Sequence, residues 1–304
     1  MKLEELKKEV WQANMELKRV GLSLSTWGNV SGIDRERELV VAKPDNIPYH
    51  ELRVEHMLVV DLQGKIVEGR WNPLPDTLTH LVLYRHFSQI GGVAHTHSSF
   101  ACVWAQAGSG IPCLGTTHAD YFYGEIPCTR ALTAGEIEEN YESAIGEVIV
   151  ERFRTLDYRR LPGVLVSYHG PFTWGKTPEE AVHHGIVLEE IAKTTYFALL
   201  LNPERNPVSL PLLDRRFFRQ HGFAMDYARK TTTLRYKTVR LAANRVEAEL
   251  IKGYLEAEGI GVILKPSTFP YGGEAYFGDT GPFEIQVPEE RFADAQRIIT
   301  DLER

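Results

Sequence analysis

Three histidines near the ends of two apolar segments have the types and spacing of metal ligands. His95 and His97 follow the apolar residues of "IGGVAHTHSSF", and alternation along a strand over 91–97 would place both imidazoles on one face. A second apolar segment, 163–170, ends with His169. Two strands that each end in histidine could assemble three imidazoles and leave a coordination position open, as catalytic zinc sites do. A hydrogen-bonded core histidine and a loop histidine remain alternatives.

The surrounding sequence alternates between helical and strand patterns. Apolar spacing predicts helices, with Asp76 as a candidate N-cap residue for the second of them. Helices are expected at 3–20, 77–88, 99–107 and 178–200, with two helices or one broken helix over 133–154. Strands are expected at 38–42, 57–61, 65–68, 91–97 and 163–170. This order predicts an α/β fold with a mostly antiparallel central sheet covered by helices.

Composition narrows the class of protein. The chain has 304 residues, 43% of them hydrophobic and 25% charged, which is ordinary for a globular protein. Its formal net charge of −7 argues against a nucleic-acid or anionic-membrane surface. No segment reaches the roughly 20 apolar residues of a membrane span, and the charged N-terminal helix is not a signal peptide. The three cysteines have no CxxC spacing, so we expect reduced thiols and a cytoplasmic location.

Several sequence blocks resemble the L-ribulose-5-phosphate 4-epimerases of the class II aldolase/adducin family over residues 1–229. The blocks are "TWGNVS", "DTLTH", "HTH", "WAQAGSGIPCLGTTHADYFYGEIPCTR", "SYHGPFTWGK" and "AVHHGIVLEEIA". The resemblance implies a catalytic domain over 1–230. It also implies a zinc ion, replaceable by manganese or cobalt, with ligands His95, His97, His169 and Asp76.

The resemblance further implies a retro-aldol reaction that breaks the C3–C4 bond of a ketose and re-forms it on the other face. Zinc would polarise the carbonyl and the adjacent hydroxyl. Inversion needs proton-transfer groups on both faces of the aldehyde fragment. Asp120 matches the family's acid/base on one face, and Tyr227 matches a tyrosine supplied by a neighbouring subunit, which implies a cyclic homotetramer with active sites between subunits. Taken alone, Asp120 could be a turn or cap residue and Tyr227 a surface aromatic.

The chain departs from the family where the relatives bind phosphate. The family's "KPSG" loop reads "KPDN" here, so Asp45 and Asn46 replace a serine and a glycine. Leu74 and Pro75 replace the serine pair before the DTxTH aspartate. We therefore expect a non-phosphorylated ketose; a shifted loop with another basic residue on the phosphate is the alternative. The expected substrate-binding residues are Asn29, Lys43, Asp45 and Asn46.

Residues 231–304 are predicted to form a separate small domain. Strands at 235–242, 260–265 and 283–287, with helices at 244–258 and 288–303, give a β-α-β-β-α order. This segment resembles a small prokaryotic signal-transducing domain of ferredoxin-like type. It shows no catalytic or phosphate motif, so a binding or assembly role and a purely structural appendage both remain open.

Four functions are compatible with the main domain. The first is a metal-dependent 4-epimerase of a free ketose, and the second is an L-ribulose-5-phosphate 4-epimerase proper. The third is an aldolase that releases the two fragments, and the fourth is a non-catalytic adducin-like module. Because the complete set of candidate ligands and acid/base residues is present, we favour the epimerase.

Overall fold

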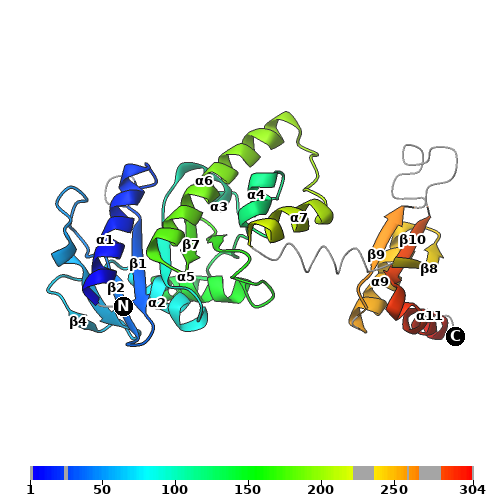
Figure 1. Ribbon diagram of the computed structural model, residues 1–304, viewed down its shortest axis with the longest axis horizontal. Helices are drawn as coiled ribbons and strands as arrows, with labels where there is room; N and C mark the ends of the chain where they lie inside the picture. The colour runs from blue at the N-terminus through cyan, green and yellow to red at the C-terminus, as the bar shows by residue number, and fades with distance from the viewer. Residues whose placement is uncertain (1–2, 24–26, 222–235, 259, 267–281, 303–304) are drawn as a thin grey trace. The chain divides into compact units, whose positions relative to one another are not determined.

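The computed structural model of the chain describes residues 3–23, 27–221, 236–258, 260–266 and 282–302 (Figure 1). The chain divides into two compact units, Met1–Gly222 and Phe223–Arg304, and each is described by itself. The boundary expected between residues 230 and 231 lies outside the described residues.

The first unit contains a seven-stranded sheet in which every pair of neighbouring strands is antiparallel, as predicted. The strand order is β4-β3-β2-β1-β5-β7-β6. The strands are β1 Asn29–Asp34, β2 Leu39–Ala42, β3 Leu58–Asp61, β4 Ile66–Glu68, β5 Gly92–His95, β6 Gly163–Leu165 and β7 Pro171–Gly175. β1 and β7, which flank β5 in the middle of the sheet, were not expected from the sequence.

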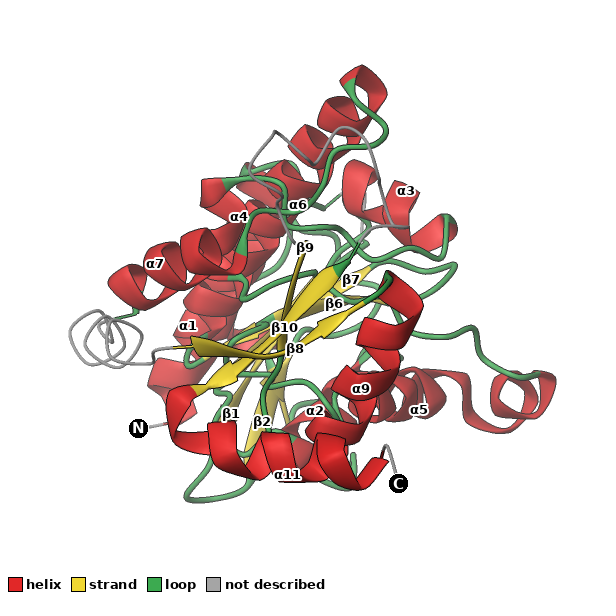
Figure 2. Ribbon diagram, turned by 90° about the vertical axis from the view of Figure 1, so that its right-hand side faces the viewer, coloured by secondary structure: helices red, strands yellow, loops and turns green. Residues whose placement is uncertain are grey.

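Helices cover both faces of this sheet (Figures 1 and 2). Long helices α1 and α6 pack on each other and on β1, while α2 packs on β1 and α5. The helices are α1 Leu3–Arg19, α2 Thr77–His86, α3 Ser99–Gln106, α4 Thr116–Tyr121, α5 Ala134–Arg152, α6 Pro178–Leu201 and α7 Leu210–Gln220, with a 3-10 turn at Val54–His56. α4 and α7 were not predicted.

The Gly-Gly pair that precedes β5 has a packing reason. A Cβ on Gly91 would lie 2.0 Å from the carbonyl oxygen of Lys176, and one on Gly92 would lie 2.5 Å from Pro178 at the start of α6. Only glycine permits this close approach of α6 to the strand. The pair therefore fixes how β5, and the histidine at its end, meets the helical layer.

Two predicted strands are shorter than expected, and both end beside the histidines. β5 stops at His95, so His97 lies beyond the strand rather than on it. The predicted strand 163–170 is wrong beyond Leu165, because Tyr168 has a left-handed φ of 64° and the His169 N–H donates to the carbonyl of Val166 at 3.0 Å. Pro171 does not end a strand but begins β7, a position that needs no backbone donor.

The second unit has the predicted β-α-β-β-α order and its own hydrophobic core. Among the described residues its antiparallel sheet has three strands in the order β8-β10-β9, the order of the corresponding strands in a ferredoxin-like fold. The elements are β8 Tyr236–Ala242, α9 Arg245–Ala257, β9 Ile263–Pro266, β10 Phe283–Pro288, a 3-10 turn at Glu289–Arg291 and α11 Phe292–Leu302.

Candidate active site

The structure brings His95, His97 and His169 together at one end of the central strands, where β5 ends and β7 begins. Their candidate ligand nitrogens all lie within 4.8 Å of one another. Nε2 of His95 is 3.1 Å from Nε2 of His97. Two imidazole nitrogens at zinc-bond length, with an N–Zn–N angle near 90–110°, would lie about 2.9–3.4 Å apart. The donor set therefore fits one small divalent cation.

Neighbouring groups hold the His95 ring in a single orientation. The ring stacks on Phe172 with centroids 4.1 Å apart, and its Nδ1 lies 3.0 Å from the carbonyl oxygen of Pro171. Because that carbonyl can only accept, Nδ1 carries the proton and Nε2 presents a lone pair. Trp27, 5.9 Å from the His97 ring, borders the site on its exposed side.

Burial keeps the three imidazoles neutral. It is the largest cause that lowers the pKa of His95 to about 3, and the His97 ring adds to it. Burial also lowers the pKa of His169 to about 3, and it lowers the pKa of His97. Nδ1 of His169 is buried without a hydrogen-bond partner among the described residues. Three neutral rings with converging nitrogens are suited to metal coordination.

These lowered pKa values predict an acid-sensitive metal-free protein. Since the unfolded chain binds protons to these histidines near pH 6.5 and the folded chain binds them only near pH 3, stability should fall as the pH falls between these values. Each such histidine contributes a slope of up to about 1.4 kcal/mol per pH unit. Urea unfolding of chelator-treated protein at pH 7.5, 6 and 5 measures this slope.

Two variants control that experiment. His118 is buried away from the three histidines, its Nε2 lies 2.7 Å from the carbonyl oxygen of Gly124, and its pKa is lowered to about 4 by burial. His118→Gln should therefore reduce the slope, whereas His50→Gln, at an exposed position, should not. A pH-independent unfolding free energy between pH 7.5 and 5 would contradict the prediction.

Asp76 lies next to the three histidines but outside the cluster that they form. It occupies the N-cap position of α2 without a side-chain cap bond. Its Oδ2 instead accepts a 2.8 Å hydrogen bond from Nδ2 of Asn29, which pairs with His95 across β1 and β5. The Asp76 charge opposes the lowering of the His97 and His169 pKa values. Its role as a further metal ligand stays a prediction.

A buried polar row behind the site was missed from the sequence. Asp76, His80 and Tyr84 are spaced by four residues along α2 and therefore share one face. Ser31 of β1 lies between the last two, with its Oγ 2.7 Å from Nδ1 of His80 and 2.9 Å from the hydroxyl of Tyr84. His80 is fully buried, and burial lowers its pKa to about 3. The i, i+4, i+8 spacing was the available signal.

The Asp120 carboxylate forms an ion pair with an arginine side chain. This carboxylate on α4 accepts hydrogen bonds on both oxygens from Arg216 of α7, the one from Nε at 2.8 Å, and the Asp120 carbonyl oxygen lies 3.0 Å from Nε2 of His221. Asp120 thus joins α4 to α7 and is not in the histidine cluster. Tyr227, the other expected acid/base residue, lies outside the described residues.

The two segments that depart from the family pattern lie side by side. The backbone N–H of Asp45 donates to the carbonyl of Asn72 at 2.9 Å, and Pro44 forms a β-bridge with Pro73. Asn46 has φ of 57°, a left-handed conformation that glycine adopts most easily and asparagine tolerates. Its backbone N–H and its Nδ2 donate to the Asp45 carboxylate at 2.8 and 2.7 Å.

Lys43 is buried at the base of this loop. Its Nζ lies 5.1 Å from the ring centroid of Tyr49, a residue whose hydroxyl donates to the carbonyl of Gly28. Burial lowers the Lys43 pKa against the opposing fields of Asp45 and Asp76. A buried ammonium of this kind is a strong hydrogen-bond donor for an oxygen acceptor.

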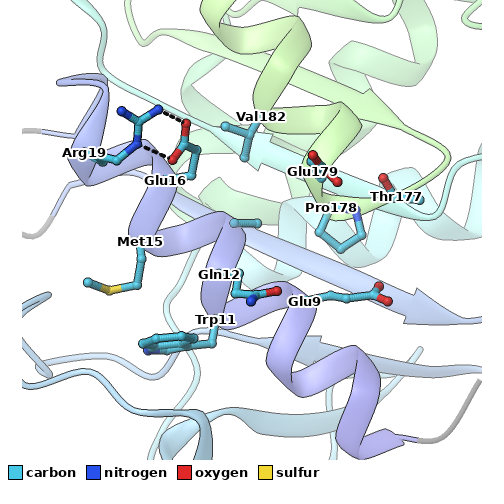
Figure 3. Close-up of a pocket in the computed structure, with 11 residues that line it drawn as sticks. Glu9, Trp11, Gln12, Met15, Glu16, Arg19, Thr177, Pro178, Glu179 and Val182 are labelled. Carbon is cyan, nitrogen blue, oxygen red and sulfur yellow. Dashed lines mark hydrogen bonds and ion pairs between the residues drawn. The ribbon is translucent and has the colours of Figure 1, made fainter.

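A groove elsewhere in the first unit does not contain the candidate site. It has a volume of about 550 Å³, and Figure 3 shows it between α1 and the start of α6. Its lining includes Trp11, Met15, Thr177 and the Glu16–Arg19 ion pair. None of the predicted site residues lines it. The chemistry of the donor set, rather than cavity size, identifies the site.

Comparison with known proteins places the chain in a family. Residues 8–196 match the family model "Class II Aldolase and Adducin N-terminal domain", and residues 236–303 match "Putative prokaryotic signal transducing protein". The chain belongs to the class II aldolase and adducin family. None of the helices that the structure describes could cross a membrane.

Within this family the chain is closely similar to one kind of enzyme. It is 50% identical to the L-ribulose-5-phosphate 4-epimerase UlaF of Salmonella paratyphi B over 228 residues, which are 75% of this chain and the whole of that protein. UlaF of Salmonella typhi is equally similar. An L-fuculose 1-phosphate aldolase structure matches with a TM-score of 0.61 and 21% identity, covering 72% of this chain and 96% of its own. YgbL from Klebsiella pneumoniae matches at 0.58 and 22%, covering 71% and 99%. These two structures support the fold alone.

Proposed function

We propose that the chain is a metal-dependent ketose 4-epimerase that breaks and re-forms the C3–C4 bond of its substrate. The observation that carries the proposal is the convergence of three neutral imidazoles in a unit that matches 4-epimerases over their whole length. The adducin-like alternative gains no support, because a module without catalysis has no use for such a donor set.

The residues of the chain have distinct roles in this proposal. His95, His97, His169 and Asp76 would hold a divalent cation, which would supply Lewis-acid polarisation of the ketose carbonyl and the adjacent hydroxyl. Zinc is the preferred ion for a set dominated by imidazole, and manganese or cobalt can replace it. Asn29 orients Asp76 through its 2.8 Å hydrogen bond.

Proton transfer is assigned to Asp120 and Tyr227. One removes the proton of the C4 hydroxyl, the aldehyde fragment turns, and the other returns a proton on the opposite face. Arg216 orients both oxygens of the Asp120 carboxylate. Because Asp120 lies outside the histidine cluster, we propose that active sites form between subunits of a ring tetramer.

Exposed apolar side chains support assembly of the catalytic units. They lie in the last turns of α6 and at the start of α7, the helix that also carries Arg216. They are Phe197, Leu200, Leu201 and Leu210, of which Leu201 is 90% exposed. Exposed large apolar side chains on two consecutive helices are typical of interaction surfaces. Sedimentation velocity should give the mass of four chains, and a monomer would refute this part of the proposal.

We further propose that the substrate is not phosphorylated. Each lost hydroxyl donor costs about 1–3 kcal/mol where its acceptor stays unpaired. A carboxylate about 4 Å from a phosphate adds roughly 4 kcal/mol of repulsion per unit charge at an effective dielectric of 20. Asp45 occupies the place of one lost donor, beside the segment in which Leu74 and Pro75 occupy two others. A carboxylate instead accepts hydrogen bonds from sugar hydroxyls, and Lys43 and Asn46 can add donors.

The ratio of kcat/KM for L-ribulose to that for L-ribulose 5-phosphate tests the substrate. We expect the free ketose to be preferred. Restoring the family pattern with D45S, N46G, L74S and P75S should shift the ratio towards the phosphate ester by about 10³-fold or more, since each 1.4 kcal/mol is tenfold.

A matched variant controls this measurement. Glu51→Ser removes an exposed carboxylate from the same segment and should leave the ratio unchanged. A strong preference of the unaltered enzyme for the phosphate ester would defeat the substrate proposal while leaving the epimerase proposal intact.

A further inference from the structure

Helix α9 of the second unit carries apolar side chains on two faces. The inner face packs on the three-stranded sheet and comprises Ala248, Ile251 and Leu255. The other face is exposed and forms a stripe at a spacing of four residues. The stripe consists of Val246, Leu250 and Tyr254, which are 81%, 63% and 48% exposed.

A glycine borders this stripe and has no packing partner among the described residues of the unit. Gly253 lies in the middle of α9, where glycine costs about 1 kcal/mol relative to alanine. A Cβ at Gly253 would have no atom within 4 Å in the part of the chain that the structure describes. A small residue beside an apolar stripe allows another helix to approach closely.

We infer that the stripe binds the α9 helix of a second copy of the chain, in antiparallel orientation about Leu250. Charges on the Gly253 side of the stripe favour this occupant. In order along the helix they are Arg245, Glu249, Lys252 and Glu256, with alternating sign. Antiparallel pairing places Arg245 beside Glu256 of the second copy and Glu249 beside Lys252. Parallel pairing would instead place this flank against the other flank of the second copy, which carries no such row of alternating charges.

The other side of the stripe adds no opposing charge. The acidic side chain that this side carries within α9, Glu247, is engaged at the start of the helix. Its carboxylate accepts from the N–H of Ala243 at 2.8 Å, and its own N–H donates to Asn244 at 3.0 Å. Two helices that meet over three turns bury less than the roughly 1,200 Å² of a stable free interface. The pairing is therefore weak alone and gains strength between copies held in one assembly. It does not depend on the proposed epimerase activity.

Cysteine cross-linking of the full chain tests both the contact and its register. Leu250→Cys should form an interchain disulfide under mild oxidation, because the two residues at position 250 face each other. Val246→Cys should cross-link at least tenfold more slowly, because the two cysteines would lie about 12 Å apart along the axis, beyond disulfide reach. The double variant V246C/Y254C should cross-link again.

The unaltered chain, with Cys102, Cys113 and Cys128, gives the background. Equal rates for the 246 and 250 variants, or no cross-link at 250, would overturn the inference. If no cross-link forms at position 250 and the unaltered chain has a higher mass because it binds a different protein, the stripe belongs to the interface with that partner.

Charge reversal provides an independent test in the Leu250→Cys background. Arg245→Glu or Glu256→Arg alone should slow cross-linking several-fold, and the two together should restore it. Failure of the double reversal to restore the rate would overturn the antiparallel register. Steady-state kinetics of each variant should match the unaltered chain, because α9 contains none of the proposed active-site residues.

Discussion

Replacing His97 with alanine should reduce bound metal from about one ion per chain to nearly none. His97 supplies one of three converging nitrogens, and its Nε2 lies 3.1 Å from that of His95. Two remaining imidazoles would hold the ion far more weakly, because the binding free energy of such sites depends on the full ligand set. Turnover should fall by about 10²–10⁴-fold, the several kcal/mol expected of a Lewis acid. Metal analysis after dialysis measures the stoichiometry.

His50→Ala is the matched control, since it removes an exposed histidine outside the cluster. It should retain both metal and turnover. Full metal content in the His97 variant would contradict the assigned site. Loss of metal with unchanged turnover would contradict the proposed chemistry.

Replacing Asp120 with asparagine should lower kcat by about 10²–10⁴-fold while metal content and KM change little. This is the usual contribution of a general acid or base. Asparagine keeps the size of the side chain and one oxygen for Arg216, so the contact between α4 and α7 should persist. Near-normal turnover would remove Asp120 from the mechanism.

Two variants separate chemistry from packing at this position. Arg216→Gln breaks the same ion pair but leaves the carboxylate in place. Asp214→Asn removes a carboxylate that accepts from Tyr123 within the same region. If Asp120 acts on the reaction, its variant should lose at least tenfold more kcat than either of these. Equal losses in the Asp120 and Arg216 variants would show that the ion pair is structural.

The sequence predicted the convergence of the three histidines more reliably than the elements that hold them. Strand alternation predicted that His95 and His97 share one face of a strand. In the structure the strand ends at His95, and the two rings are in contact just beyond that end. His169 lies in a turn whose left-handed residue is Tyr168, a tyrosine that gives no turn signal in sequence. Convergence depends on contacts between β1, β5 and β7, which local patterns do not encode.

Central strands β1 and β7 were missed for identifiable reasons. β1, "NVSGID", has polar Asn29 and Ser31 on the face towards α2, so it lacks an apolar alternation although every residue is buried. β7 begins with Pro171, which usually ends strand predictions. The polar row on α2 was not predicted because aspartate and histidine count as surface residues in a hydrophobic pattern.

The second unit was predicted almost element by element because its signals are local. Asn244, a residue type typical of helix starts, caps α9 and accepts from the N–H of Glu247 at 3.0 Å. The apolar spacing of α9, however, fits two faces of the helix. Only the structure distinguishes the face that packs on the sheet from the exposed stripe around Leu250.

The rate of inversion at C4, measured before and after metal removal, tests the central proposal most directly. Purified enzyme is incubated with a ketose, and the two C4 epimers are separated by chromatography. The account predicts interconversion of the epimers, its loss on chelation, and its return when one equivalent of zinc per chain is added. Inversion that persists in fully chelated protein, or release of the two fragments without inversion, would contradict the account.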